Sequence, residues 1–191
     1  EYGAEIRVAI VDPTLIAMLE ESLASLPPGD GRLRARVQAR FAGALQPAVD
    51  PQKPIELARE AIAMARRLAD PATLLSVIHD GMAAMMDFVG PDERLPLNRE
   101  VERLAVALHD RPKQLRAHAR LVFDSVERGD VAAIDVHANA YARLAEELRW
   151  PAARWLAPLL RSVRPMMAGD FARVEDLAEQ ARQAADASQD P

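Results

Sequence analysis

Proline and glycine recur along this chain at a nearly constant interval of about 40 residues. Prolines expected to open helices fall at positions 71, 112, 151 and 191. Glycines between them fall at positions 90, 129 and 169. The strings RGDVA (128–132) and AGDFA (168–172) align at the same offset. A fixed period that holds two helices is typical of an α-solenoid.

Between these breaks, apolar residues recur every three or four positions, which indicates helices, and the alternation expected of strands is nearly absent. The sequence predicts an all-α protein, a right-handed α-solenoid of helix-turn-helix repeats with a period of about 40 residues and about nine helices. The last four helices are expected at 112–128, 130–149, 151–168 and 170–187. We expect one domain over residues 1–191, cut from a longer multidomain protein, with residues 1–11 as a linker or the tail of a preceding element.

Local residues refine this prediction. Gly129-Asp130 and Gly169-Asp170 are expected to form tight turns in which the aspartate caps the following helix. Pro158 and Pro165 lie inside the expected helix 151–168, where an interior proline removes a hydrogen bond and kinks the backbone. Alanine, which lets helices approach closely, replaces the aromatic residues, which make up only 4% of the chain.

Composition excludes several classes of function. The net charge of −5 argues against nucleic-acid binding, which depends on surplus positive charge. The absence of cysteine excludes disulfides, thiol catalysis and cysteine metal sites. No apolar run approaches the roughly 18–20 residues needed to span a bilayer.

Catalytic and cofactor-binding motifs are also missing. The glycine positions form neither a phosphate-binding loop nor a nucleophile elbow. None of the four histidines has Glu or His three or four positions away, so the sequence predicts no metal, no cofactor and no enzyme activity. His79 and His118 lie one repeat interval apart, at comparable places in successive repeats, and a hydrogen-bonded or groove-lining role is favoured over metal binding.

A binding surface is expected on the concave side of the solenoid, built by the first helix of each pair. Residues on these helices whose side chains could face a partner are candidates for binding it: His79, Arg116, Arg120, Arg154 and Arg161.

Three strings, LAREAIAMARRLADPATL (57–74), RLAEELRWPAARW (143–155) and AGDFARVEDLAEQARQAAD (168–186), resemble tetratricopeptide-type repeats. They are similar to the long variant that follows the nucleotide-binding module of large bacterial signalling ATPases and LuxR-type transcriptional regulators. This resemblance covers nearly all of the chain from Asp12 onward. It implies a cytoplasmic sensor or protein-interaction arm that regulates attached domains.

The favoured interpretation is therefore a non-catalytic scaffold that binds a protein, a peptide or other domains of its parent chain, with no direct contact to nucleic acid or membrane. Weak self-association through exposed repeat ends is also expected. The alternative is an all-α domain that binds a small molecule, as in the effector half of a one-component regulator. A closed pocket of several hundred Å³ would favour that alternative.

Overall fold

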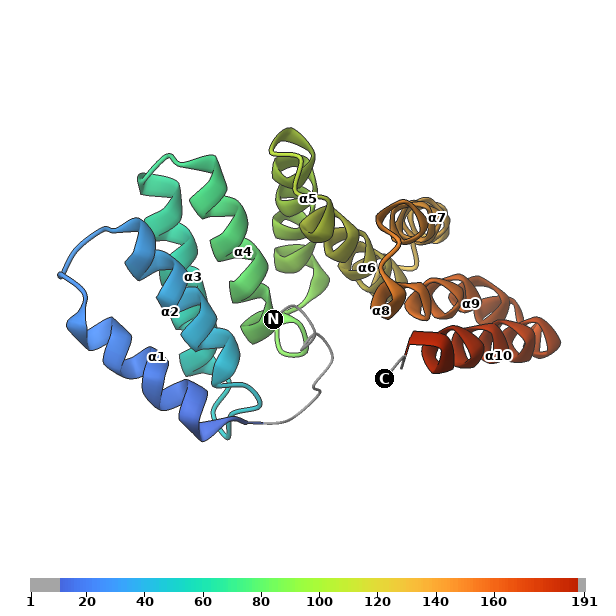
Figure 1. The fold of residues 1–191 in the computed structure, drawn as a ribbon, viewed down its shortest axis with the longest axis horizontal. Coiled ribbons are helices and arrows are strands. Elements are labelled where there is room, and N and C mark those ends of the chain that lie inside the picture. The colour runs from blue at the N-terminus through green and yellow to red at the C-terminus, as the bar shows by residue number, and fades with distance from the viewer. Residues whose placement is uncertain (1–10, 189–191) are drawn as a thin grey trace. The chain divides into compact units, whose positions relative to one another are not determined.

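The computed structural model describes residues 11–188, and all regular secondary structure in that range is helical (Figure 1). The predicted all-α class is confirmed. The interpretation of residues 1–11 lies outside the described residues except for Val11. The helices are α1 (Pro13–Ser25), α2 (Arg32–Ala44), α3 (Gln52–Arg67), α4 (Pro71–Met85), α5 (Pro91–Ala107), α6 (Arg111–Glu127), α7 (Val131–Leu148), α8 (Pro151–Arg154), α9 (Leu156–Ala168) and α10 (Phe171–Ser188).

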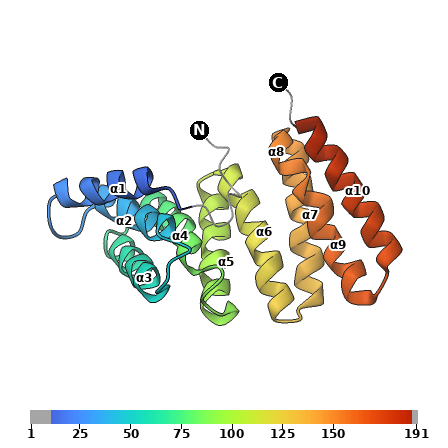
Figure 2. The ribbon, with the colours of Figure 1, turned by 90° about the horizontal axis from the view of Figure 1, so that it is seen from below.

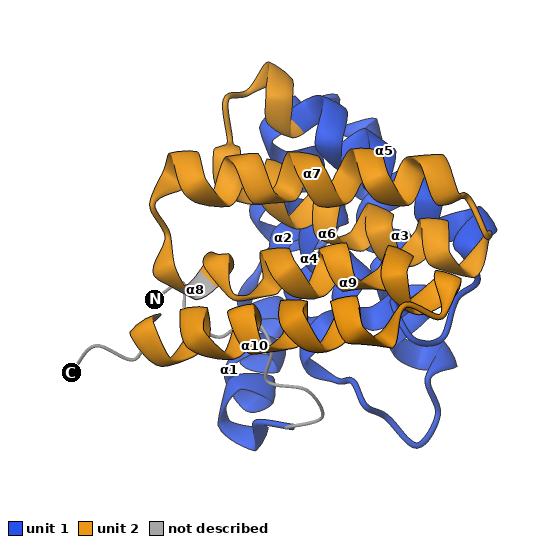
Figure 3. Cartoon of the chain, turned by 90° about the vertical axis from the view of Figure 1, so that its right-hand side faces the viewer, with its two compact units in different colours: residues 1–104 blue, residues 105–191 orange. Residues whose placement is uncertain are grey.

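Contacts within the chain group into two compact units, residues 1–104 and residues 105–191 (Figure 3). We describe each unit by itself. The boundary falls near the end of α5. A single domain over 1–191 stays a prediction.

In unit 1, α2 packs against both α3 and α4, α3 packs against α4, and α1 lies against α2. The approach of α2 to α4 requires a glycine, because a β-carbon on Gly43 would lie 2.9 Å from Cβ of Ala83. Arg59 on α3 holds Glu93 of α5 through two hydrogen bonds of 2.8 Å. The fully buried alanines predicted by the composition are present: Ala35, Ala39, Ala42, Ala58, Ala61 and Ala65.

In unit 2, the helices lie side by side in chain order, α6 against α7, α7 against α9 and α9 against α10 (Figure 2). The short α8 contacts α7, α9 and α10. Tyr141 is the large aromatic residue of this core, and its hydroxyl donates to the carbonyl of Ala153 at 3.1 Å. The rest of the core is aliphatic: Leu115, Val122, Ile134, Ala138, Ala142, Leu144, Ala145, Ala153, Ala157 and Leu160.

The turns that join these helices are built as the sequence predicts. Gly129 and Gly169 adopt left-handed conformations, with φ of 65° and 75°. The amides of Asp130 and Asp170 each donate back to a carbonyl five residues earlier at 2.9 Å, which satisfies the end of the preceding helix. The carboxylate of Asp130 then accepts the Ala133 amide at 3.0 Å, and that of Asp170 accepts an amide of α10 at 3.1 Å. Each aspartate therefore ends one helix and begins the next.

Left-handed residues also end helices where the sequence has no glycine. Ala69, His109 and Arg149 have φ of 51°, 56° and 49°. They follow one another at the same interval that separates Gly129 from Gly169. This interval agrees with the spacing read from the sequence. The right-handed superhelix and the structural repeat itself stay predictions.

The helix expected over 151–168 is divided into α8 and α9 at Trp155. The physical cause is Pro158, which has no amide hydrogen for the carbonyl of Arg154 and whose ring crowds that carbonyl. Pro165 does not interrupt α9, which continues to Ala168. Every other predicted helix has one counterpart among the described residues.

Candidate functional site

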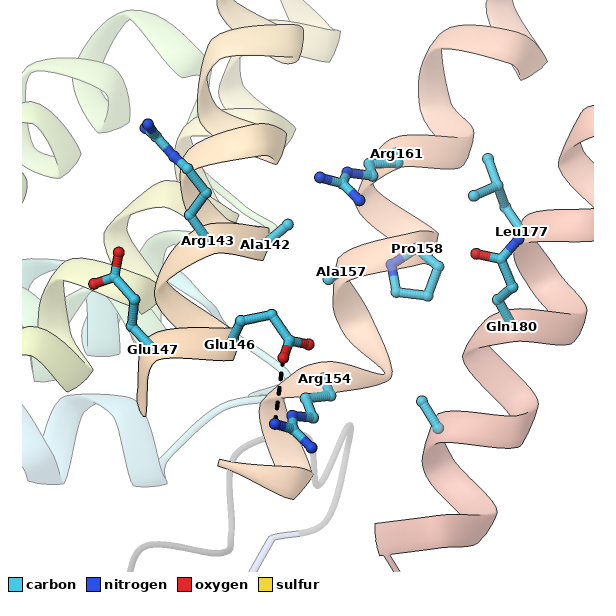
Figure 4. A pocket seen from close by; sticks show the side chains of 11 residues that line it. Ala142, Arg143, Glu146, Glu147, Arg154, Ala157, Pro158, Arg161, Leu177 and Gln180 are labelled. Carbon is cyan, nitrogen blue, oxygen red and sulfur yellow. Dashed lines mark hydrogen bonds and ion pairs between the residues drawn. The ribbon is translucent and has the colours of Figure 1, made fainter. Parts of the chain in front are cut away.

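A groove of about 530 Å³ lies in unit 2, among α7, α8, α9 and α10 (Figure 4). Its apolar lining comes from small or buried side chains, with Ala142 on α7, Ala157 and Pro158 on α9, and Leu177 on α10. Because alanine projects only a methyl group, facing helices leave open space beside it. The groove thus follows from the same composition that builds the alanine-rich core.

Charged side chains form the exposed part of the groove lining. Glu146 pairs with Arg154, with 3.3 Å between Oε2 and Nη2, as the dashed line in Figure 4 marks. Glu147, next along α7, pairs with Arg111 of α6. Both groove carboxylates are therefore already neutralised by arginines.

Two further arginines line the groove and are exposed to solvent, Arg143 on α7 and Arg161 on α9. Neither pairs with a carboxylate in the part of the chain that the structure describes. The Arg161 side chain extends from α9 toward α7 in Figure 4. The groove consequently has an excess of positive charge, although the whole chain is acidic.

Arg154 also has a hydrogen-bond donor without an acceptor. Its Nε is buried and has no hydrogen-bond partner among the described residues.

The structure brings together two of the five predicted site residues, since Arg154 and Arg161 both line the groove. Arg116 and Arg120 lie on α6, partly buried, and are not among the residues that line it. The Arg116 guanidinium lies 5.9 Å from the centre of the Trp150 ring, and burial lowers the pKa of Arg116. His79 is buried on α4 of unit 1.

Two histidines of unit 2 are in contact, which was not predicted from the sequence. Nδ1 of His118 on α6 lies 3.1 Å from Nδ1 of His137 on α7. His118 is buried, and the burial, with the charges of His137 and Arg143, lowers its pKa to about 4. The two residues are 19 positions apart, so no helical spacing within one segment links them.

No family model matches this chain, and no curated protein matches it. Among the described residues, no helix is both long enough and apolar enough to cross a membrane.

Proposed function

We propose that this chain is a non-catalytic interaction scaffold of a multidomain signalling or transcriptional regulator. In this proposal the groove of unit 2 binds a segment of a partner protein or of another domain of the parent chain. A cytoplasmic, tetratricopeptide-like array regulating attached domains belongs to the same proposal. The lining supports it, because the described groove residues are Ala, Arg, Glu, Pro, Leu and Gln, without a hydroxyl or imidazole that could act as nucleophile or base.

The observation that carries this proposal is the charge imbalance of the groove. Its two glutamates are paired within the protein, whereas Arg143 and Arg161 are exposed without a carboxylate partner. Charge-assisted hydrogen bonds from guanidinium to carboxylate are stronger than neutral ones. A fitting segment therefore carries acidic side chains beside small apolar ones that cover Ala142 and Ala157.

Fluorescence anisotropy with synthetic peptides tests the proposal. A labelled peptide that alternates Glu with Ala and Leu is expected to bind, and its Gln counterpart is expected to bind at least about tenfold more weakly, a difference of about 1.4 kcal/mol. Raising the salt concentration should weaken binding of the acidic peptide more than binding of the Gln peptide.

Arg161→Glu is expected to reduce binding of the acidic peptide by about tenfold or more. The matched control is Arg40→Glu, because Arg40 is also an exposed arginine on a helix but lies on α2 of unit 1. Equal binding of the Glu and Gln peptides, or equal losses in the two variants, would refute the proposal.

The second candidate function is small-molecule binding by an effector domain. The groove volume favours it, because about 530 Å³ lies within the usual range of ligand pockets, roughly 300–1,000 Å³. The exposed lining, with Arg143, Glu146 and Arg161 open to solvent, favours the peptide instead. A thermal-shift screen in which Arg161→Glu abolishes the response to a small anion, while no peptide binds, would select the second function.

A further inference from the structure

The α6–α7 hairpin places two histidines on the inner faces of its helices. His118 follows the buried Leu115 by one helical turn, and His137 follows the buried Ile134 in the same way. Residues three or four positions apart share a face of a helix, so both imidazoles lie on core-facing surfaces. Side chains of this kind are seldom placed in an apolar core without a hydrogen-bond or ligand partner.

The rings of His118 and His137 are arranged so that two nitrogens meet. Their Nδ1 atoms are 3.1 Å apart, the ring centroids are 5.3 Å apart, and the ring planes are inclined by 34°. Two imidazoles that bind one tetrahedral Zn²⁺ at the usual Zn–N distance have nitrogens about 3.3 Å apart and centroids about 5 Å apart. The ring centres are therefore already at the separation that a shared metal ion requires.

We propose that His118 and His137 form a binding site for a divalent transition-metal ion of the Zn²⁺ class, with water completing the coordination. In the metal-free protein one ring donates its Nδ1 proton to the other. A small rotation of each imidazole about χ2 points the Nδ1 lone pairs of both rings at one position for the ion. This position lies to one side of the line between the two Nδ1 atoms. The proton of the donor ring moves to its own Nε2, so both rings stay neutral and no proton is lost.

The surroundings of the pair determine how strongly it binds. Only the neutral imidazole is a ligand, so binding is measured above the ordinary pKa of histidine, about 6.5. His137 is only partly buried, which gives the ion and its waters a route to the site. The positive charge of Arg143 opposes cation binding, but that side chain is exposed and water screens it.

Titration of the tag-free, chelator-treated chain with Zn²⁺, followed by calorimetry at pH 7.5, tests the proposal. One ion per chain is expected to bind. His137→Gln is expected to weaken binding at least about tenfold, because removal even of an indirect supporting group costs that much at metal sites. The control is His109→Asn, which removes an exposed imidazole from a left-handed position that asparagine tolerates.

Histidine side-chain nitrogen resonances of the unaltered protein give a second readout that does not depend on the folding of a variant. Zn²⁺ is expected to shift the signals of His118 and His137 and to leave those of His79 and His109 in place. The proposal is overturned if Zn²⁺ does not bind, if His137→Gln binds as tightly as His109→Asn, or if other histidines shift instead. Peptide binding by the groove is a separate measurement, so neither result decides the other.

Discussion

His118 makes the stability of this protein sensitive to mild acid. In the folded chain burial lowers its pKa to about 4, whereas an unfolded histidine titrates near 6.5. Below pH 6.5 the unfolded chain therefore binds a proton that the folded chain rejects. The contribution of neutral His118 is fully present above pH 6.5 and is lost as the pH falls from 6.5 toward 4.

The size of this effect follows from the two pKa values. Between pH 7 and pH 5 the free energy of unfolding is expected to fall by about 2 kcal/mol through His118 alone. Asp70 and Glu93, whose pKa values are lowered by hydrogen bonds from Thr73 and Arg59 respectively, lose their contribution only at lower pH.

Urea denaturation at pH 7 and pH 5, in the presence of a chelator, measures this change. In His118→Gln the loss between the two pH values is expected to be smaller by about 2 kcal/mol, whatever the stability of the variant at pH 7. His137 and Arg143, the charged or titratable neighbours that lower the pKa, remain in place in this variant. An equal loss in both proteins would refute the reasoning, as would a His118 pKa near 6.5 in a direct NMR titration of the folded chain.

Other substitutions test how the helices end. Asp130→Ala is expected to lower the free energy of unfolding by about 1 kcal/mol in urea denaturation, because the Ala133 amide loses its acceptor; an unchanged midpoint would contradict the cap. Gly169→Ala is expected to cost about 1 kcal/mol in the same assay, since φ is 75° there, and a cost near zero would exclude the left-handed turn. Pro158→Ala is expected to join α8 to α9 and to slow amide exchange around Trp155, and unchanged exchange would assign the break to another cause.

The sequence allowed prediction of those parts of the fold that rest on local chemistry. Asp70 before Pro71, and Gly169 before Asp170, mark helix ends through capping and backbone conformation, which involve only neighbouring residues. The left-handed conformation at Arg149 could not be predicted, because nothing in that side chain favours it.

The candidate site, like the fold, was predictable from the sequence only in part. Arg154 and Arg161 were predicted because they lie on the first helix of a pair, which is expected to build the concave surface, and both line the groove. The contact of His118 with His137 depends on how two antiparallel helices align, which a pattern within either helix does not report. The sequence also does not show which arginines lack a carboxylate partner, because ion pairs form between different helices. Glu147 of α7, for example, pairs with Arg111 of α6.

The turn between α6 and α7 also determines in which direction around the helix axis the side chains of α7 point. It contains only residues 128–130, so Asp130 fixes both where α7 begins and which way its first side chain points. Each residue turns an α-helix by about 100°. One residue inserted between Asp130 and His137 would rotate the imidazole by that angle, away from His118. Asp130 thus determines the direction of a side chain seven positions downstream without touching it, because the place where α7 begins fixes the direction of every later side chain on that helix.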